Sequence, residues 1–170
     1  MVPSKTEKID LSHLDATGQV RMVDVSAKAA THREACASAR VRLTGKVLDA
    51  LMQGSLPKGD ALATARVAGI LAAKRTSEWI PLCHPLVLTW VRIEFERGSP
   101  QQLLIRCSTK TVAQTGVEME AMTGAAAAAL TVYDMVKGAD RSVVIGPIQL
   151  EYKAGGKSGT YQRDGGPSVG

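Results

Sequence analysis

The heptapeptide IPLCHPL, residues 80–86, places a cysteine beside a histidine and encloses both between prolines. Such a pair can bind a metal, combine a nucleophile with its base, or form a stiff turn. In extended backbone, adjacent side chains point to opposite faces, so Cys83 and His84 are not expected to face each other. Pro81 and Pro85 hold the residues before them away from helical geometry. The spacing argues against a Cys–His catalytic pair and leaves open whether His84 is functional or only structural.

A carboxylate and an ammonium recur near the end of a long predicted helix, in TVYDMVKG. Asp134 and Lys137 are three positions apart and therefore lie on one helix face. Most such pairs are solvent-exposed salt bridges worth a few tenths of a kcal/mol. The alternative is a carboxylate whose protonation is tuned by its neighbour and that serves general acid-base chemistry. The spacing alone allows both interpretations.

Glu120 precedes Asp134 by fourteen positions on the same predicted helix. The two residues return to nearly the same face, but a rise of ~1.5 Å per residue separates them by ~21 Å, so they cannot act on one atom. Glu118 and Glu120 can simply be acids placed favourably near the positive end of the helix. If both Glu120 and Asp134 are functional, they contact opposite ends of a long ligand or belong to a site shared between subunits.

Metal and phosphate motifs are not apparent in the sequence. The three histidines show no ligand-like clustering with acids or thiols, so no metal site is predicted. The segment AGGKSG, residues 154–159, fails the Walker pattern because Glu151 stands where that motif requires a glycine. This segment remains either a flexible basic loop, with Lys153 and Lys157, or a loose end.

Length and composition predict one globular domain covering residues 1–170, with residues 1–18 and 160–170 flexible. No apolar run has membrane-spanning length, and the start lacks the hydrophobic core of a signal peptide. A cytoplasmic protein that does not associate with a membrane is therefore expected. Three widely spaced cysteines predict reduced thiols.

The net charge of +5 favours an anionic partner. One Phe, three Tyr and two Trp are few rings for stacking bases, which argues against nucleic acid.

The strands that must position these groups follow from alternating apolar residues. QVRMVDVS at 19–26 predicts a strand with an antiparallel partner in ASARVRL at 37–43. The intervening residues can belong to either strand or to a loop. Two strand-like runs on either side of Gly98, Ser99 and Pro100 predict a hairpin. A last strand is predicted at 142–153.

Helical spacing predicts a short helix from Thr44 to Gly54 and a longest helix over 117–137. Between them, Asp60 is expected to cap a helix that ends near Arg75. Its apolar side is expected to comprise Ala63, Val67, Ile70 and Leu71. The predicted order, ββααββαβ, indicates an α+β fold with a mainly antiparallel sheet and its helices on one face. The alanine run within the longest helix predicts close packing.

Several motifs taken together resemble one family. MVDVSAKAATHREA, IPLCHPL, TGVEMEAMTGAAAAALTVYDMVKG and VIGPIQLEYKAGGKSG occur in uninterrupted order across about residues 20 to 159. In these stretches the chain resembles the MoaC family, the cyclic pyranopterin monophosphate synthases of molybdenum cofactor biosynthesis. LCHPL combined with GVEMEA and YDMVK is far more specific than any of these motifs alone.

The resemblance implies a ferredoxin-like α+β subunit assembled as a homohexamer, a trimer of dimers, with active sites at subunit interfaces. It implies conversion of 3',8-cyclo-7,8-dihydroguanosine 5'-triphosphate to cyclic pyranopterin monophosphate with release of pyrophosphate. The substrate would come from a radical SAM enzyme acting on GTP, and no redox cofactor would be needed. An interface site would also account for the separation between Glu120 and Asp134.

The resemblance also implies roles for individual residues. Asp134 matches the catalytic aspartate of the family, and the lysines that match its active site are Lys58, Lys137 and Lys153. The positions that match its substrate-binding segments or the adjoining basic loop are Leu82, Cys83, His84, Met119, Glu120 and Lys157. His84 is then expected to be a polar contact of a rigid substrate-holding loop and a candidate proton carrier.

The chain departs from the family at two places in the long helix: Val136 stands where many relatives carry cysteine, and Gly124 with five alanines replaces a more varied stretch. Both differences affect packing and leave the ionisable groups unchanged. The competing class is a module that binds a phosphate ligand or nucleic acid without turnover. Retention of Asp134 and Lys137 favours the enzyme.

Overall fold

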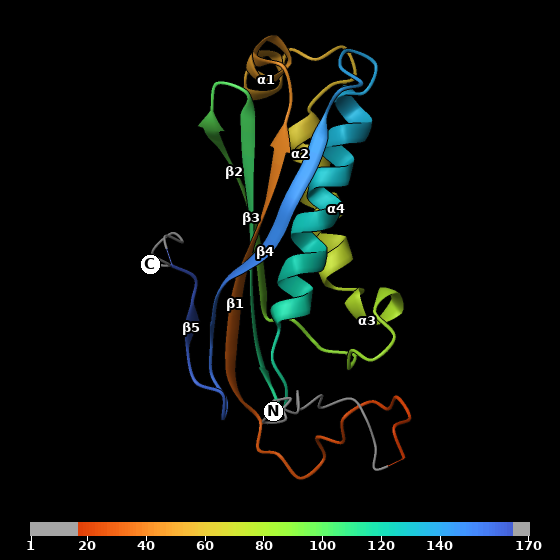
Figure 1. Cartoon of the computed structure of the whole chain (residues 1–170), viewed down its shortest axis with the longest axis vertical. Coiled ribbons are helices and arrows are strands. Elements are labelled where there is room, and N and C mark those ends of the chain that lie inside the picture. The colour runs from red at the N-terminus through yellow and green to blue at the C-terminus, as the bar shows by residue number, and fades with distance from the viewer. Residues whose placement is uncertain (1–16, 165–170) are drawn as a thin grey trace, which may run out of the picture.

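The structure, a computed structural model, describes residues 17–164 as an antiparallel five-stranded sheet with helices on one face (Figure 1). Its elements are β1 (Thr31–Arg42), α1 (Gly45–Met52), α2 (Ala61–Ala73), α3 (Thr76–Trp79), β2 (Trp90–Ser99), β3 (Gln102–Ala113), α4 (Glu118–Val136), β4 (Val144–Ala154) and β5 (Tyr161–Gln162). The strand order is β2-β3-β1-β4-β5. The predicted α+β class is confirmed, and the arrangement is ferredoxin-like.

The central strand β1 carries the core because its alternate side chains face the helices. Ala35, Ala37, Ala39 and Val41 are all at most 2% exposed. β1 pairs with β3 along its whole length and with β4 on its other side. Small residues on this face let α4 lie close to β1, β3 and β4, and the helix also contacts β2.

The predicted apolar side of α2 is wrong for two of its four residues, although Ile70 does pack against the core. Val67 is 58% exposed and Leu71 is 47% exposed, whereas the buried residues of α2 are Ala61, Ala65, Gly69, Ala72 and Ala73. The reason is the close approach of α2 to α4. A methyl group added at Gly69 would lie 2.9 Å from the main-chain oxygen of Gly124, so only the small-residue face fits there. The close packing predicted from the alanine run is confirmed.

The predicted first strand over residues 19–26 is also wrong. Only Val20 forms an isolated bridge there, and the first strand begins at Thr31. The cavity described below is lined by Val20, Val23 and Val25. Their apolar character reflects this position and not the alternation of a strand. The hairpin of β2 and β3 is confirmed.

The remaining helix predictions hold with small shifts at the ends. α1 lies within the predicted Thr44 to Gly54, and α4 begins and ends one residue inside the predicted 117–137. The carboxylate of Asp60 accepts a hydrogen bond from the backbone N–H of Ala63 at 2.8 Å, which confirms the predicted cap. A short α3 follows α2 as a separate turn of helix.

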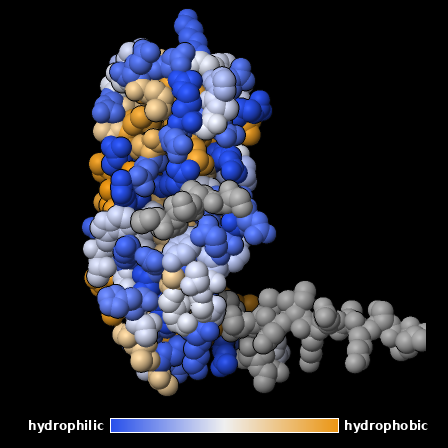
Figure 2. All heavy atoms as spheres, turned by 90° about the vertical axis from the view of Figure 1, so that its left-hand side faces the viewer, coloured by the Kyte–Doolittle hydropathy of each residue, from blue (hydrophilic) through white to orange (hydrophobic). Residues whose placement is uncertain are grey.

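At the C-terminus, β5 pairs with β4, although its two residues fall within the predicted flexible tail. The rest of that tail, 165–170, and residues 1–16 lie outside the described residues. Figure 2 shows the side that carries β2 and β5, where hydrophilic side chains dominate and hydrophobic ones gather along one margin of the upper half. Within residues 17–164, no helix has the length and hydropathy needed to cross a membrane.

Candidate active site

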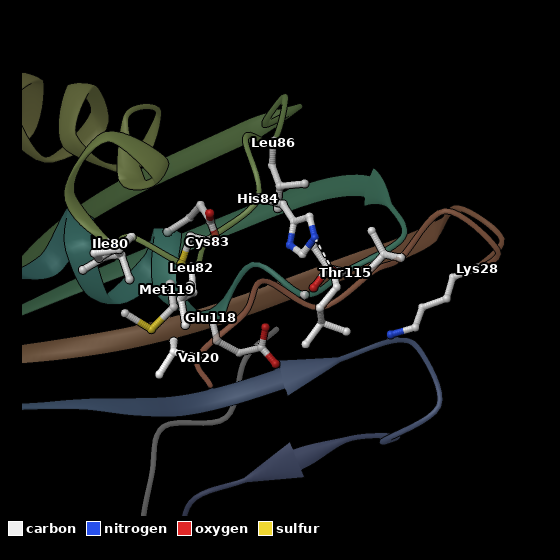
Figure 3. A pocket seen from close by; sticks show the side chains of 15 residues that line it. Val20, Lys28, Ile80, Leu82, Cys83, His84, Leu86, Thr115, Glu118 and Met119 are labelled. Carbon is white, nitrogen blue, oxygen red and sulfur yellow. Dashed lines mark hydrogen bonds between the residues drawn. The ribbon is translucent and has the colours of Figure 1, made fainter. Parts of the chain in front are cut away.

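A cavity of about 800 Å³ opens at the N-terminal end of α4 (Figure 3). Its walls come from three segments that are distant in sequence: the irregular stretch 20–28, the turn 80–86 and residues 115–120. The predicted substrate-binding residues that line it are Leu82, Cys83, His84, Met119 and Glu120. The fold thus brings the IPLCHPL turn and the first turn of α4 to one place.

The IPLCHPL turn holds His84 in a defined position. The Cys83 N–H donates to the Ile80 carbonyl at 3.0 Å, and His84 Nε2 lies 2.8 Å from the Val23 carbonyl oxygen (Figure 3). An Nε2–H can donate to this carbonyl oxygen. His84 thereby fastens the 20–28 segment to the cavity. The turn therefore holds the 20–28 segment and also places one imidazole in the cavity wall.

Cys83 is not an activated nucleophile. Burial raises the pKa of its thiol, and the charge of Glu120 raises it further. The imidazole of His84 is engaged with Val23, and the described structure gives no hydrogen bond between the cysteine and the histidine. Neither a lowered pKa nor a hydrogen bond to the imidazole activates the Cys83 thiol in this geometry.

Glu120 is a buried carboxyl of the cavity wall. It is 4% exposed, and burial raises the pKa of its carboxyl from the ordinary 4.5 to about 7. A hydrogen bond from its own backbone N–H lowers that pKa, and the neighbouring charge of Glu118 raises it. A carboxyl with a pKa near neutrality can both accept and donate a proton under ordinary conditions.

Lys153 of β4 is not one of the wall residues of the cavity but contacts one of them. Its Nζ lies 3.2 Å from Glu118 Oε1 and donates to Ser158 Oγ at 2.6 Å. Lys153 contacts the cavity through Glu118, which lines it. Lys157 lies in the turn after β4 and is exposed.

Three other predicted residues meet at the C-terminal end of α4. Lys137 Nζ lies 2.6 Å from Asp134 Oδ1, and Lys58 Nζ donates to the main-chain oxygen of Asp134 at 3.1 Å. The hydrogen bond and charge of Lys137, with a smaller effect of Lys58, lower the pKa of Asp134. Asp134 in turn raises the pKa of Lys137. All three side chains are solvent-exposed, and the pair stays charged at neutral pH.

The predicted site is therefore divided between the two ends of α4. The cavity with Glu120 and Lys153 lies at one end, and Asp134 with its two lysines lies at the other, ~21 Å away along the helix. Sequence reasoning did not single out Lys28, which lines the cavity from the 20–28 segment. Within residues 17–164, no three His, Cys, Asp or Glu side chains are grouped so as to hold a metal ion.

The chain is a ferredoxin-like α+β protein with a cavity walled by LCHPL and by the first turn of a long helix. The sequence profile of the MoaC family matches residues 22–156, and the chain belongs to this family.

Similar proteins include the cyclic pyranopterin monophosphate synthase of Thermomicrobium roseum, which is 54% identical over 91% of this chain and 94% of its own length. The proteins of the same name from Pelobacter propionicus and Pelotomaculum thermopropionicum are each 50% identical. They match 93% and 91% of this chain, and 99% and 92% of their own lengths.

Proposed function

We propose that the chain is a cyclic pyranopterin monophosphate synthase that converts 3',8-cyclo-7,8-dihydroguanosine 5'-triphosphate to cyclic pyranopterin monophosphate and releases pyrophosphate. The observation that carries the proposal is the similarity to proteins of this name at 50 to 54% identity over more than 90% of the chain. The net charge of +5 suits a triphosphate substrate. In this role the protein acts in molybdenum cofactor biosynthesis, in the cytoplasm, after a radical SAM enzyme that acts on GTP.

The chemistry requires proton carriers near the base and cations near the phosphates. Opening a purine ring and rebuilding a pterin involves repeated proton transfers to nitrogen and oxygen. Glu120, with a pKa of about 7, and His84 are placed to exchange protons or bind in the cavity. Asp134 and Lys137 form the second proton-transferring pair of the proposal.

The lysines supply positive charge where the reaction gathers negative charge. Lysine ammonium groups bind phosphates as point charges and stabilise a departing pyrophosphate. Lys58 and Lys153 are the lysines that we assign to base or phosphate groups, with Lys157 and the backbone around Leu82, Cys83 and Met119 completing the binding surface.

A complete site requires two subunits in this proposal. One chain offers the cavity, and a second chain offers the C-terminal end of α4 with Asp134, since ~21 Å separates the two groups in one subunit. We propose a homohexamer, a trimer of dimers, as the assembly that pairs these ends.

The deciding experiment is single-turnover conversion of the cyclic dihydroguanosine triphosphate by the parent chain and by Asp134→Asn. Asp49→Asn is the matched control, because Asp49 is also an exposed aspartate in an ion pair, at 2.5 Å from Arg97. Product from the parent and the control, with a loss of about a hundredfold or more in Asp134→Asn, supports the proposal. A folded parent that binds the substrate and forms no product would identify a non-catalytic binding module.

Subunit complementation tests the shared site separately. Asp134→Asn and Glu120→Ala chains, each of low activity alone, are co-expressed with different tags and the mixed assemblies are purified. If the site is shared, some interfaces combine an intact cavity with an intact Asp134, and activity returns to a substantial fraction of the parent value. Mixed assemblies that stay as inactive as either variant would show that one chain supplies both groups.

A further inference from the structure

The turn between β4 and β5 packs closely against the start of β1. Gly155 and Gly156 have φ of 97° and 76°, in the region that favours glycine. A methyl group on Gly155 would lie 2.2 Å from the His32 carbonyl oxygen, and one on Gly156 would lie 1.6 Å from Arg33 Nη1. At Gly155 the main chain of β1 leaves no room for a side chain, and at Gly156 the positive φ favours glycine, so the turn packs closely against the strand.

Arg163 anchors the other end of this hairpin. Its backbone N–H donates to the Glu151 carbonyl and its Nε–H to the Leu150 carbonyl, both at 2.8 Å. The guanidinium also lies 3.7 Å from the Glu151 carboxylate, whose side chain is 3% exposed. Ser38 and Gln149 donate further hydrogen bonds to that carboxylate. A buried, multiply bonded carboxylate is a firm attachment, because removing one partner leaves an uncompensated charge.

This turn places one hydroxyl against Lys153, whose ammonium also contacts a wall residue of the cavity. Ser158 Oγ accepts a hydrogen bond from Lys153 Nζ at 2.6 Å, while Glu118 Oε1 lies 3.2 Å from the same ammonium. The Lys153 side chain is 22% exposed although its residue lies next to an exposed turn. Two contacts from different elements therefore determine where the end of a flexible lysine side chain lies.

We propose that Ser158 is a positioning residue, which holds the Lys153 ammonium at the rim of the cavity beside Glu118. This inference rests on the proposed function, because it gives Ser158 an effect on turnover only through Lys153. A hydroxyl suits the task since it is neutral: it orients the ammonium without cancelling the positive charge that a phosphate would meet. Glu118 alone would leave the lysine free to swing away from the cavity on its four-carbon stem.

The test uses Ser158→Ala and Ser158→Thr in the full chain, with Ser99→Ala as a control in the distant turn between β2 and β3. Limited acylation with acetic anhydride, quantified by mass spectrometry, reports the freedom of Lys153, and exposed Lys46 serves as the internal reference. Loss of a hydrogen bond to a charged group is expected to speed acylation of Lys153 roughly three- to tenfold in Ser158→Ala. In Ser158→Thr, which keeps the hydroxyl, and in the control, the rate should match the parent.

Turnover provides the second measurement. Under the proposal, kcat/KM falls roughly tenfold in Ser158→Ala and is retained in Ser158→Thr, and Lys153→Gln is at least as impaired as the alanine variant. Unchanged acylation of Lys153 in Ser158→Ala overturns the proposal, as does a threonine variant that behaves like alanine. A parent chain without turnover refutes the proposed function, and the acylation rates still decide whether Ser158 holds Lys153.

Discussion

Lys58 and Asp134 are 76 positions apart in the chain, and they meet where α4 ends, with Lys58 Nζ 3.1 Å from the main-chain oxygen of Asp134. Lys58 thus adds a second cation beside the carboxylate that already pairs with Lys137. Their combined effect lowers the pKa of Asp134, so this carboxylate is ionised at every pH at which the protein is expected to work. A proton donor at this end must then be an ammonium.

Replacing Lys137 by methionine is expected to lower kcat by about a hundredfold or more, because the proposed proton donor is lost. Asp134 remains ionised at neutral pH even with an ordinary carboxyl pKa, so the acidic limb of the pH–rate profile should not shift. Rates from pH 5 to pH 9 check this expectation. A loss that is restored as the pH rises would assign the effect to the ionisation of Asp134 instead.

Glu120 should make stability fall as pH rises. Above pH 4.5 an unfolded chain releases this proton, whereas the folded chain keeps it until about pH 7. The free energy of unfolding therefore falls by roughly 3 kcal/mol between these two pH values, and it changes little through this group at higher pH. Urea unfolding of the parent and of Glu120→Gln at pH 5 and pH 8 measures it. Relative to the parent, the free energy of unfolding of Glu120→Gln should be higher at pH 8 than at pH 5. An equal difference between variant and parent at both pH values would contradict the raised pKa.

His84→Ala should loosen the 20–28 segment, because it removes the hydrogen bond to the Val23 carbonyl. Trypsin is then expected to cleave after Arg21 and Lys28 several times faster than in the parent, since opening is opposed by one hydrogen bond fewer. His32→Ala, at an exposed histidine outside the cavity, is the control. Cleavage at the parent rate in His84→Ala would mean that other contacts hold the segment.

Gly124→Ala is expected to destabilise the fold by about 1–3 kcal/mol, although alanine is the better helix former. A methyl group at this position would lie 2.5 Å from the buried Cys107 Sγ. In the double variant Gly124→Ala with Cys107→Ala, the clash is removed and part of the loss should be recovered. Urea unfolding of the parent, both single variants and the double variant gives the coupling energy, and a value of zero would show that Cys107 is not the obstacle.

Sequence patterns predicted the elements well where periodicity reflects core packing, and failed where it has another cause. The cavity is lined by Val20, Val23 and Val25, and their spacing in the sequence resembles the alternation of a strand. On α2, the bulky residues Val67 and Leu71 indicated the wrong face, because a close helix–helix approach selects small side chains.

The candidate site was predictable only as separate motifs. The spacing within α4 correctly placed Glu120 and Asp134 at its two ends, since helix geometry alone determines that distance. The contacts of Lys153 with Glu118 and Ser158 depend on the register of β4 and on the fold of a turn. Neither of these can be derived from local sequence, which is why Ser158 carried no signal.

The alanine-rich middle of α4 also acts as a spacer that sets the distance between the two ends of the helix. Gly124 is held in place against α2, so a single residue inserted after it would leave the first turn of the helix where it is. It would carry the carboxylate of Asp134 about 1.5 Å further along the axis and turn it by about 100°. An insertion or deletion of one residue would therefore aim Asp134 away from the neighbouring subunit that we propose it serves, even if every side chain in the stretch stayed small.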